Sequence, residues 1–236
     1  MRARRSFFHR LLRWTAGLVL GWIALTLLMV ATLRFVPPLS SAVMLGRQLD
    51  ARLDGQKDFR LRYHWTPISK VSANLPIALV AAEDQKFPSH HGFDVDAIQD
   101  ALADADDGAR LRGASTISQQ VAKNLFLWNG RSFVRKGLEA YFTVLIELLW
   151  PKQRIIEVYL NIAEFGDGTY GAAAASERFF RVAPAQLNSH QAALLAAVLP
   201  SPRKLHVDRP SPYVQRRADW IERQVRQLGG SAYLGL

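Results

Sequence analysis

An uncharged apolar run near the amino terminus is the strongest constraint on this chain. Residues Trp14 to Leu33 contain no charged side chain. A helix rises about 1.5 Å per residue, so a run of this length spans roughly 30 Å, the thickness of a bilayer's hydrocarbon core. A secretory signal peptide has a shorter apolar region, about 7–15 residues, and a small-residue cleavage site. Arg34 and two prolines follow the run instead, so we predict a retained transmembrane helix.

Basic residues gather directly before this run. The formal net charge is +10, and half of the excess is carried by Arg2, Arg4, Arg5, Arg10 and Arg13, with no acid among them. The positive-inside rule keeps such a cluster cytoplasmic, so the rest of the chain is expected outside. A nucleic-acid-binding domain would instead spread basic charge over its surface, interleaved with exposed aromatic residues. We therefore do not expect nucleic acid as a partner.

Length and cysteine content limit the remaining possibilities. The 236 residues leave room for one domain of ordinary size beside the anchor. The chain has no cysteine, which excludes a disulfide framework, a thiolate metal site and a cysteine nucleophile. The predicted organisation is a basic cytoplasmic tail over 1–13, a transmembrane helix over 14–33, a membrane-proximal lead-in over 34–70 and one folded domain over 71–236.

Hydrophobic periodicity predicts that this domain is mainly helical. No run has the alternating pattern of a strand, and there is no internal repeat. Asn74 is expected to cap a helix that reaches Glu83, and the segment 133–149 is apolar almost all round, which predicts a buried helix. The remaining helices are expected at 116–125, 152–160, 191–199 and 213–228, with Gly229 as a stop signal.

Aspartates are concentrated in residues 94–107, which raises the question of a calcium loop. Such a loop needs regularly spaced oxygen ligands, a central glycine and a terminal glutamate, and that spacing is missing. A solvated acidic helix face is the better interpretation.

The block from Glu83 to Gly92 reads EDQKFPSHHG. Glu83 follows an apolar helix, and a carboxylate at an apolar border can have its pKa raised towards neutrality, which suits a general base. The alternative is an exposed acid at a helix end. His90 and His91 have no H-E-x-x-H pattern near them, so we expect structural histidines and no metal site.

The block from Gly113 to Asn124 reads GASTISQQVAKN. Thr116, Gln120 and Lys123 are spaced four and then three residues apart, which stacks a hydroxyl, an amide and an ammonium group on one helical face. An anionic, sugar-like ligand would need such a polar stripe ending in a cation.

Glu139 lies within a helix that is otherwise predicted to be buried. A buried carboxylate needs a partner or a raised pKa, and Arg135, one turn earlier, is the local candidate, with Lys136 nearby. Glu83 and Glu139 together provide a pair of carboxyl groups, as enzymes of glycosyl transfer and glycoside hydrolysis use.

Four basic residues, Lys123, Arg131, Arg135 and Lys136, lie within one short stretch. Each alone would more often belong to a solvated face. As a set beside two acids they predict a phosphate site, because a diphosphate leaving group needs cations as charge develops. No glycine-rich nucleotide loop is present, which disfavours a soluble nucleotide sugar as the donor.

The two blocks closely resemble the first two motifs of the family 51 glycosyltransferases, the peptidoglycan glycosyltransferases that polymerise lipid II. Arg135 to Glu139, RKGLE, looks like the third motif. KQRIIEVYLN, from Lys152 to Asn161, looks like the fourth, and YGAAAASERFF, from Tyr170 to Phe180, resembles the fifth. Five motifs in order make the resemblance highly specific, and it extends from about Leu75 to Pro202.

The resemblance implies a reaction and two catalytic residues. Glu83 would be the general base that deprotonates the 4-hydroxyl of the acceptor GlcNAc, which attacks C1 of the donor MurNAc with inversion to a β-1,4 bond. Glu139 would support the donor side, either by orienting cations or by helping to hold a divalent metal. Polyprenyl diphosphate would leave.

The resemblance also implies a substrate-binding set. Lys123, Arg131 and Arg135 would hold the diphosphate. The loop around Glu83 would be shaped by Asp84, Phe87 and His90. The sugar and phosphate cleft would be lined by Thr116, Gln119, Gln120 and Asn124. A divalent cation, Mg²⁺ or Mn²⁺, at the diphosphate is left open, and no organic cofactor is expected.

By the same resemblance the fold is a lysozyme-like helical glycosyltransferase domain behind one transmembrane helix. The location would be the inner membrane, with a periplasmic catalytic domain. Partners would be lipid II, the growing glycan chain, the bilayer and cell-wall synthesis proteins involved in cell shape. Gln191 and Ser201 depart from the family's usual glutamate and asparagine, and we expect effects on packing alone.

Two alternatives bear on the activity. A membrane-anchored glycoside hydrolase or lytic transglycosylase acting on peptidoglycan would also use paired acids on a helical fold, but the basic group favours a diphosphate donor. Ser201 to Lys204 matches S-x-x-K, yet no K-T-G follows and the only S-x-N precedes it, so no transpeptidase activity is expected.

Overall fold

The structure, a computed structural model, describes residues 2–96, 99, 115–130 and 132–235. It divides into two compact units, residues 1–37 and residues 38–236. The first unit holds one long helix, α1 (Arg2–Leu33). Within it, His9–Leu33 has a mean hydropathy of 2.2 and is long and apolar enough to cross a membrane. Its leucines are mostly exposed, as expected for a helix that meets lipid instead of a protein core.

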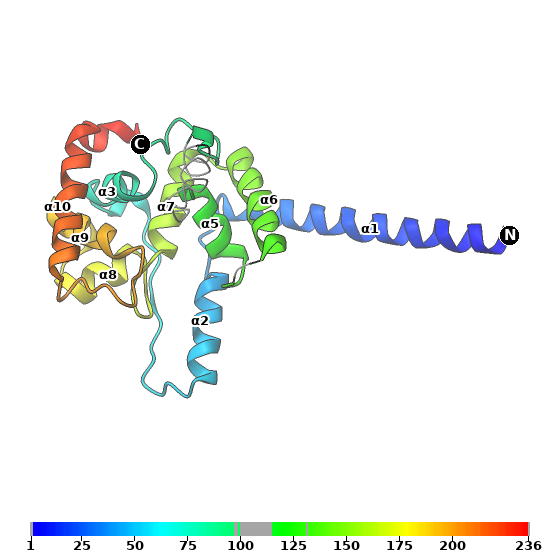
Figure 1. The fold of residues 1–236 in the computed structure, drawn as a ribbon, viewed down its shortest axis with the longest axis horizontal. Helices are drawn as coiled ribbons and strands as arrows, with labels where there is room; N and C mark the ends of the chain where they lie inside the picture. The colour runs from blue at the N-terminus through cyan, green and yellow to red at the C-terminus, as the bar shows by residue number, and fades with distance from the viewer. Residues whose placement is uncertain (1, 97–98, 100–114, 131, 236) are drawn as a thin grey trace. The chain divides into compact units, whose positions relative to one another are not determined.

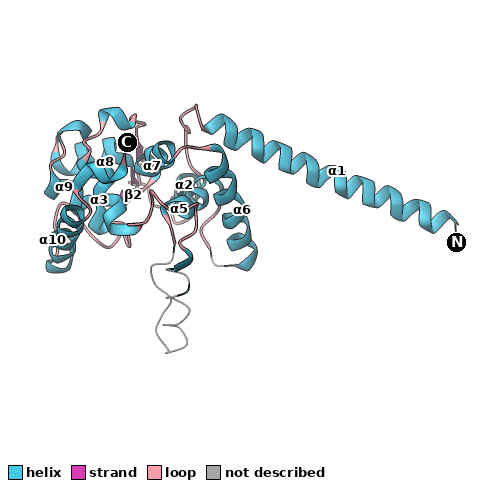
Figure 2. Ribbon diagram, turned by 90° about the horizontal axis from the view of Figure 1, so that it is seen from above, coloured by secondary structure: helices cyan, strands magenta, loops and turns pink. Residues whose placement is uncertain are grey.

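The second unit is helical throughout most of its length, as the periodicity predicts (Figures 1 and 2). One group of helices brings α3 (Asn74–Glu83) against α9 (Ser189–Val198) and α10 (Pro212–Gln227). A second group packs α5 (Ile117–Phe126) against α6 (Phe133–Leu149). The described part of this unit also contains α2 (Ala42–Leu53), α7 (Lys152–Ile162) and α8 (Gly171–Phe180).

Helix α7 connects the two groups, because it packs on α5, α3 and α8 (Figures 1 and 2). Its buried side chains include Ile155, Ile156, Val158 and Tyr159, which leave no solvated face over most of its length. Arg154 and Asn161 are buried as well, so this helix lies in the core even though its sequence is amphipathic. The two groups therefore meet at α7, and the ends of α3 and α5 come close together beside it.

A small sheet was not predicted. Strand β3 (Thr169–Tyr170) pairs in parallel with β1 (Arg62–Tyr63) and antiparallel with β2 (Glu164–Gly166), giving the order β1-β3-β2. Strands of two or three residues are too short to show a period of two in the sequence. Short 3-10 turns occur at Ile68–Lys70, Pro184–Gln186 and Gly230–Leu234.

The prediction that the helix over 133–149 is buried all round is wrong. One side of α6 is buried, through Phe142, Leu145 and Ile146, but Phe133 is 98% exposed and Leu148 is 75% exposed. Apolar composition alone does not show whether a partner covers each face of a helix.

Two smaller expectations also change. The helix expected to be capped by Asn74 begins one position earlier, with Ala73 at the cap, and the Asn74 side-chain amide instead donates to the Leu187 carbonyl at 3.0 Å. The acidic segment 94–107 lies largely outside the described residues. Within the described part, Asp94 and Asp96 both pair with the exposed Lys86 ammonium group.

Candidate active site

Glu83 is the last residue of α3, whose preceding turns are almost wholly buried. Its side chain is 16% exposed. The Gln120 amide donates from Nε2 to Glu83 Oε2 at 3.0 Å, and Nη2 of Arg217 lies 3.6 Å from Oε1. The apolar helix thus carries the carboxylate to the core boundary, where an amide and a guanidinium group meet it.

Burial is the main reason why the pKa of Glu83 is raised above its ordinary value. The Gln120 hydrogen bond and the positive charges of Arg217 and Lys123 oppose this effect, while the neighbouring Asp84 adds to it. The pKa of Glu83 is therefore shifted upwards, in the direction expected for a carboxylate at an apolar border. A carboxylate with a raised pKa is a better proton acceptor when ionised, which suits general-base chemistry.

Asp84 ties the end of α3 to the start of α5. Its Oδ2 accepts from the Ile117 backbone N–H at 2.8 Å, and both of its oxygens lie 2.9 Å from His90 Nε2. His90 Nδ1 accepts from the Gly92 N–H at 3.0 Å, so Nε2 carries the ring proton and donates to Asp84. The carboxylate also faces the positive end of a helix dipole. Asp84 and His90 therefore shape the loop after α3 through hydrogen bonds within the protein.

Phe87 completes this loop. It is fully buried and meets the His90 ring edge-on, with the ring centroids 6.2 Å apart. The Lys152 ammonium group lies 4.7 Å from the Phe87 centroid and donates to the His90 carbonyl at 2.6 Å. Lys152 also pairs with Glu147 at 2.9 Å, which joins the loop to α6 and α7.

Thr116 and Gln119, both expected from the resemblance to line the cleft, together cap the start of α5. Thr116 is the N-cap of α5, and its hydroxyl donates to the Gly92 carbonyl at 2.7 Å. Gln119 Oε1 accepts from the Thr116 N–H at 3.0 Å and completes a capping box. Gln119 is buried by this role, while Thr116 borders a cavity beside Glu83.

A polar cavity of about 240 Å³ lies along α5. Gln120, Lys123 and Asn124 line it, together with Tyr159 from α7 and Arg203 from the loop after α9. The Tyr159 hydroxyl donates to Gln120 Oε1 at 3.0 Å, which turns the Gln120 amide nitrogen towards Glu83. Lys123 forms no ion pair with any described residue, so its ammonium group is available to an anion in this cavity.

A second cavity, of about 280 Å³, includes Glu83 itself. Asp84, Asp94 and Lys86 also line it, and Trp220 of α10 contributes an aromatic side chain. Glu83 therefore lies between a cavity whose lining carries Lys123 and Arg203 and a cavity whose lining carries mainly carboxylates. Lys123 favours an anionic group in the first cavity, whereas the carboxylates of the second cavity disfavour an anion.

Glu139 is buried on α6 and holds two cations. Arg135 Nη1 lies 2.8 Å from Oε2, and Lys136 Nζ lies 2.5 Å from Oε1. The predicted partner of Glu139 is confirmed. Burial lowers the pKa of Lys123, while the negative charges of Glu139 and Glu83 oppose that lowering. Glu83, Lys123, Glu139 and Arg135 thus belong to one electrostatic cluster, whereas Arg131 lies outside the described residues.

A divalent metal held by protein side chains does not fit this cluster. Each carboxylate oxygen of Glu139 already accepts from a cationic side chain. Within the part of the chain that the structure describes, no three His, Cys, Asp or Glu residues gather as a metal site would require.

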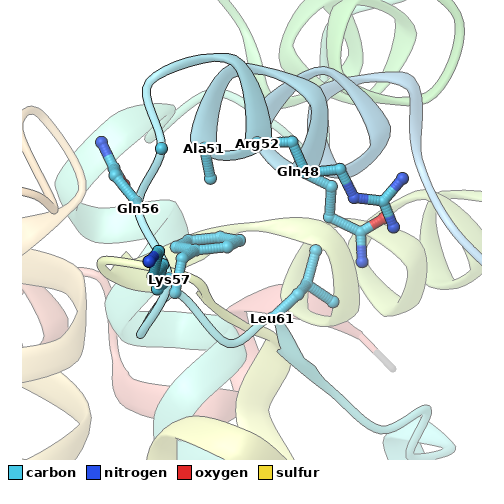
Figure 3. Close-up of a pocket in the computed structure, with 8 residues that line it drawn as sticks. Gln48, Ala51, Arg52, Gln56, Lys57 and Leu61 are labelled. Atoms are coloured by element: carbon cyan, nitrogen blue, oxygen red, sulfur yellow. The ribbon is translucent and has the colours of Figure 1, made fainter.

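A cavity larger than either of these two lies away from Glu83. Figure 3 shows a cavity of about 370 Å³ between α2 and the loop that follows it. Gln48, Arg52, Gln56 and Lys57 line it, and none of its lining residues belongs to the predicted site. It contains no acid that could act as a base, so size alone does not identify the reactive site.

Three residues beside the expected site were missed from the sequence. Arg217 and Trp220 come from α10, and Arg203 pairs with Glu164 at 3.4 Å. Several arginines on α10 look alike in the sequence, so no local signal separates Arg217 from the exposed ones. Tyr159 lay within the fourth motif, but its hydrogen bond to Gln120 needed the packing of α7 on α5.

A mainly helical domain that holds a largely buried carboxylate beside a cavity lined by a lysine and an arginine fits an enzyme that acts on glycosidic bonds. The family model described as "Transglycosylase" matches residues 52–226. The chain belongs to this transglycosylase family, and the prediction of a lysozyme-like helical glycosyltransferase domain behind an apolar amino-terminal helix is confirmed.

Relatives resemble the chain over nearly its whole length. It is 58% identical to the biosynthetic peptidoglycan transglycosylase of Xanthomonas axonopodis pv. citri (strain 306), covering 96% of this chain and 92% of the relative. Proteins of the same description in Xanthomonas campestris pv. campestris (strain B100) and Xylella fastidiosa (strain M12) are 55% and 54% identical. Those matches cover 99% of this chain and 93% and 97% of the respective relatives.

Proposed function

We propose that this enzyme polymerises lipid II into β-1,4-linked glycan strands of peptidoglycan. The observation that carries the proposal is the Glu83 carboxylate, which has a raised pKa and is held by Gln120 on the same helix that presents Lys123 to the polar cavity. A proton acceptor and a site for an anionic leaving group are thereby supplied by one short segment. The names of the relatives support peptidoglycan as the product.

The proposed step is a single displacement. Ionised Glu83 accepts the proton of the acceptor's GlcNAc 4-hydroxyl as that oxygen attacks C1 of the donor MurNAc. The bond from C1 to the α-linked diphosphate breaks from the opposite side, so the new bond is β. The proton remains on Glu83 and polyprenyl diphosphate carries away the electron pair of the broken bond.

Cations are proposed to stabilise the leaving group. Lys123 faces the polar cavity, and Arg135 is oriented by Glu139. Charge that develops on the diphosphate oxygens is stabilised most when the cations are already in place and water is scarce. Glu139 acts in this proposal by orienting Arg135 and Lys136, and Arg131 joins the same set. The assigned reaction is glycosyl transfer alone, without acyl transfer.

The location follows from the substrate. A lipid-linked donor lies in a bilayer, and the apolar helix α1 would retain the enzyme in the same bilayer. We infer that this is the inner membrane, with the arginine-rich terminus in the cytoplasm and the catalytic domain in the periplasm, where cell-wall synthesis proteins are the expected partners.

One experiment separates this proposal from hydrolysis. The purified enzyme is given lipid II in one reaction and preformed peptidoglycan in another. Growth of polymer from lipid II supports synthesis. Release of soluble sugars from peptidoglycan, without polymer from lipid II, would instead show the membrane-anchored hydrolase or lytic enzyme.

A further inference from the structure

Helix α10 contributes a cation to the reactive carboxylate from outside the five sequence motifs. Nη2 of Arg217 lies 3.6 Å from Glu83 Oε1. The Arg217 side chain is 23% exposed, so water screens this pair less than it screens a surface ion pair. No motif block quoted for the site includes this residue.

The position of Arg217 on α10 follows from the packing of that helix. Val214, Ala218 and Ile221 form its buried stripe against α9 and α3. Arg217 lies three residues after Val214 and four before Ile221, on the edge of the same face. Arg216 precedes it and is exposed. Two adjacent arginines on one helix therefore have different surroundings, and only one of them meets Glu83.

The two oxygens of Glu83 are approached by different elements. Gln120 of α5 donates to Oε2, and Arg217 of α10 lies beside Oε1. The other charged groups that act on Glu83 are Lys123 of α5 and the adjacent Asp84. Tyr159 of α7 is a further titratable group near Glu83. Burial raises the pKa of Tyr159, and the negative charge of Glu83 raises it further.

The Nε–H group of Arg217 is a buried hydrogen-bond donor. Its Nε has no hydrogen-bond partner among the described residues, although the atom is shielded from solvent. A buried N–H without an acceptor costs free energy, so a guanidinium group kept in this place suggests a role beyond fold stability.

We propose that Arg217 is a positioning residue for Glu83, holding Oε1 while Gln120 holds Oε2, so that the carboxylate stays ionised and directed at the acceptor hydroxyl. This inference rests on the proposed role of Glu83 as the base. The positive charge of Arg217 opposes the rise in the pKa of Glu83 that burial causes. Arg217 neither accepts the proton nor binds the reacting atoms.

Three full-length variants in detergent test the proposal on lipid II. Arg217→Gln should lower kcat with little change in KM, within the roughly 2-fold to 150-fold range of coupling between contacting residues. The acidic limb of its pH–rate profile should move to higher pH, because Glu83 loses a positive neighbour. Arg217→Lys should restore part of kcat. Arg216→Gln is the matched control and should behave as the unmodified enzyme.

A titration that does not depend on activity separates this inference from the proposed function. The Glu83 carboxyl carbon is labelled with ¹³C, assigned with Glu83→Gln, and titrated by NMR. A higher midpoint in Arg217→Gln than in Arg216→Gln supports the positioning role, and equal midpoints would overturn it. If Arg217→Gln does not fold, Arg217→Met, which keeps the aliphatic packing but removes the charge, is titrated instead, and a midpoint equal to that of Arg216→Gln would overturn the positioning role. Activity retained by Glu83→Gln would instead refute Glu83 as the base.

Discussion

The Gln120 amide and the Glu83 carboxylate are joined by a 3.0 Å hydrogen bond that links the start of one motif to the middle of the next. Tyr159 fixes which end of the amide faces Glu83, because its hydroxyl donates to Gln120 Oε1. Helices α5 and α7 thus both contribute to the orientation of a carboxylate carried by α3.

Removing the proton acceptor should abolish most turnover. Glu83→Gln keeps the shape of the side chain but removes its basicity, so the rate of lipid II polymerisation should fall by about 10²–10⁴. Glu177→Gln, an exposed acid on α8, is the control and should leave the rate unchanged. Near-normal turnover by folded Glu83→Gln would show that the base is another group.

The same substitution should stabilise the fold at neutral pH. Burial raises the pKa of Glu83, so its ionised form costs free energy of folding that a neutral amide avoids. The gain in Tm of Glu83→Gln over the unmodified enzyme should be present at neutral pH. It should shrink as pH falls through the folded pKa, where Glu83 is itself protonated. Thermal unfolding of both proteins across this pH range measures the difference in Tm. A difference that grows on acidification would contradict a raised pKa of Glu83 in the folded state.

Loss of a diphosphate contact should impair polymerisation. Lys123→Ala and Arg131→Ala should each raise the activation barrier by a few kcal/mol, because a cation at developing charge contributes roughly that much. Lys204→Ala, at an exposed position, is the matched control. Binding of a short neutral glycan should change little in all three variants, and normal polymerisation by the first two would place the donor elsewhere.

Glu139 should prove important for stability as well as for rate. Glu139→Ala leaves the mostly buried Arg135 without its carboxylate, which should cost about 3–5 kcal/mol in the free energy of unfolding. Glu139→Leu combined with Arg135→Met should recover much of that stability while activity stays low. Recovery of activity along with stability would show that the pair serves the fold alone.

The anchor should matter for encounter with substrate more than for chemistry. Deleting residues 1–33 removes the helix that is long enough to span a bilayer. Activity on detergent-solubilised lipid II should remain, while activity on lipid II in liposomes should fall. Protease outside spheroplasts should digest the catalytic domain, and protection of that domain would reverse the proposed orientation.

The sequence predicted most of the helices because their apolar spacing is regular, and it predicted the Arg135–Glu139 pair because both lie on one helix. The contact of Arg217 with Glu83 could not be predicted, since it depends on how α10 packs on α3. The exposed side of α6 was missed because the sequence does not show which faces of a helix other elements cover. Thr116 was recoverable: a threonine followed three residues later by Gln119 is the pattern of a capping box, which competes with a place on the helical stripe.

The hydrogen bond from the Ile117 N–H to Asp84 Oδ2 bears on which insertions and deletions this chain can accept. Asp84 and Ile117 are joined directly, so the start of α5 is fixed to the end of α3 independently of the path between them. An insertion or deletion between residues 97 and 114 should therefore leave Glu83 and Gln120 in register.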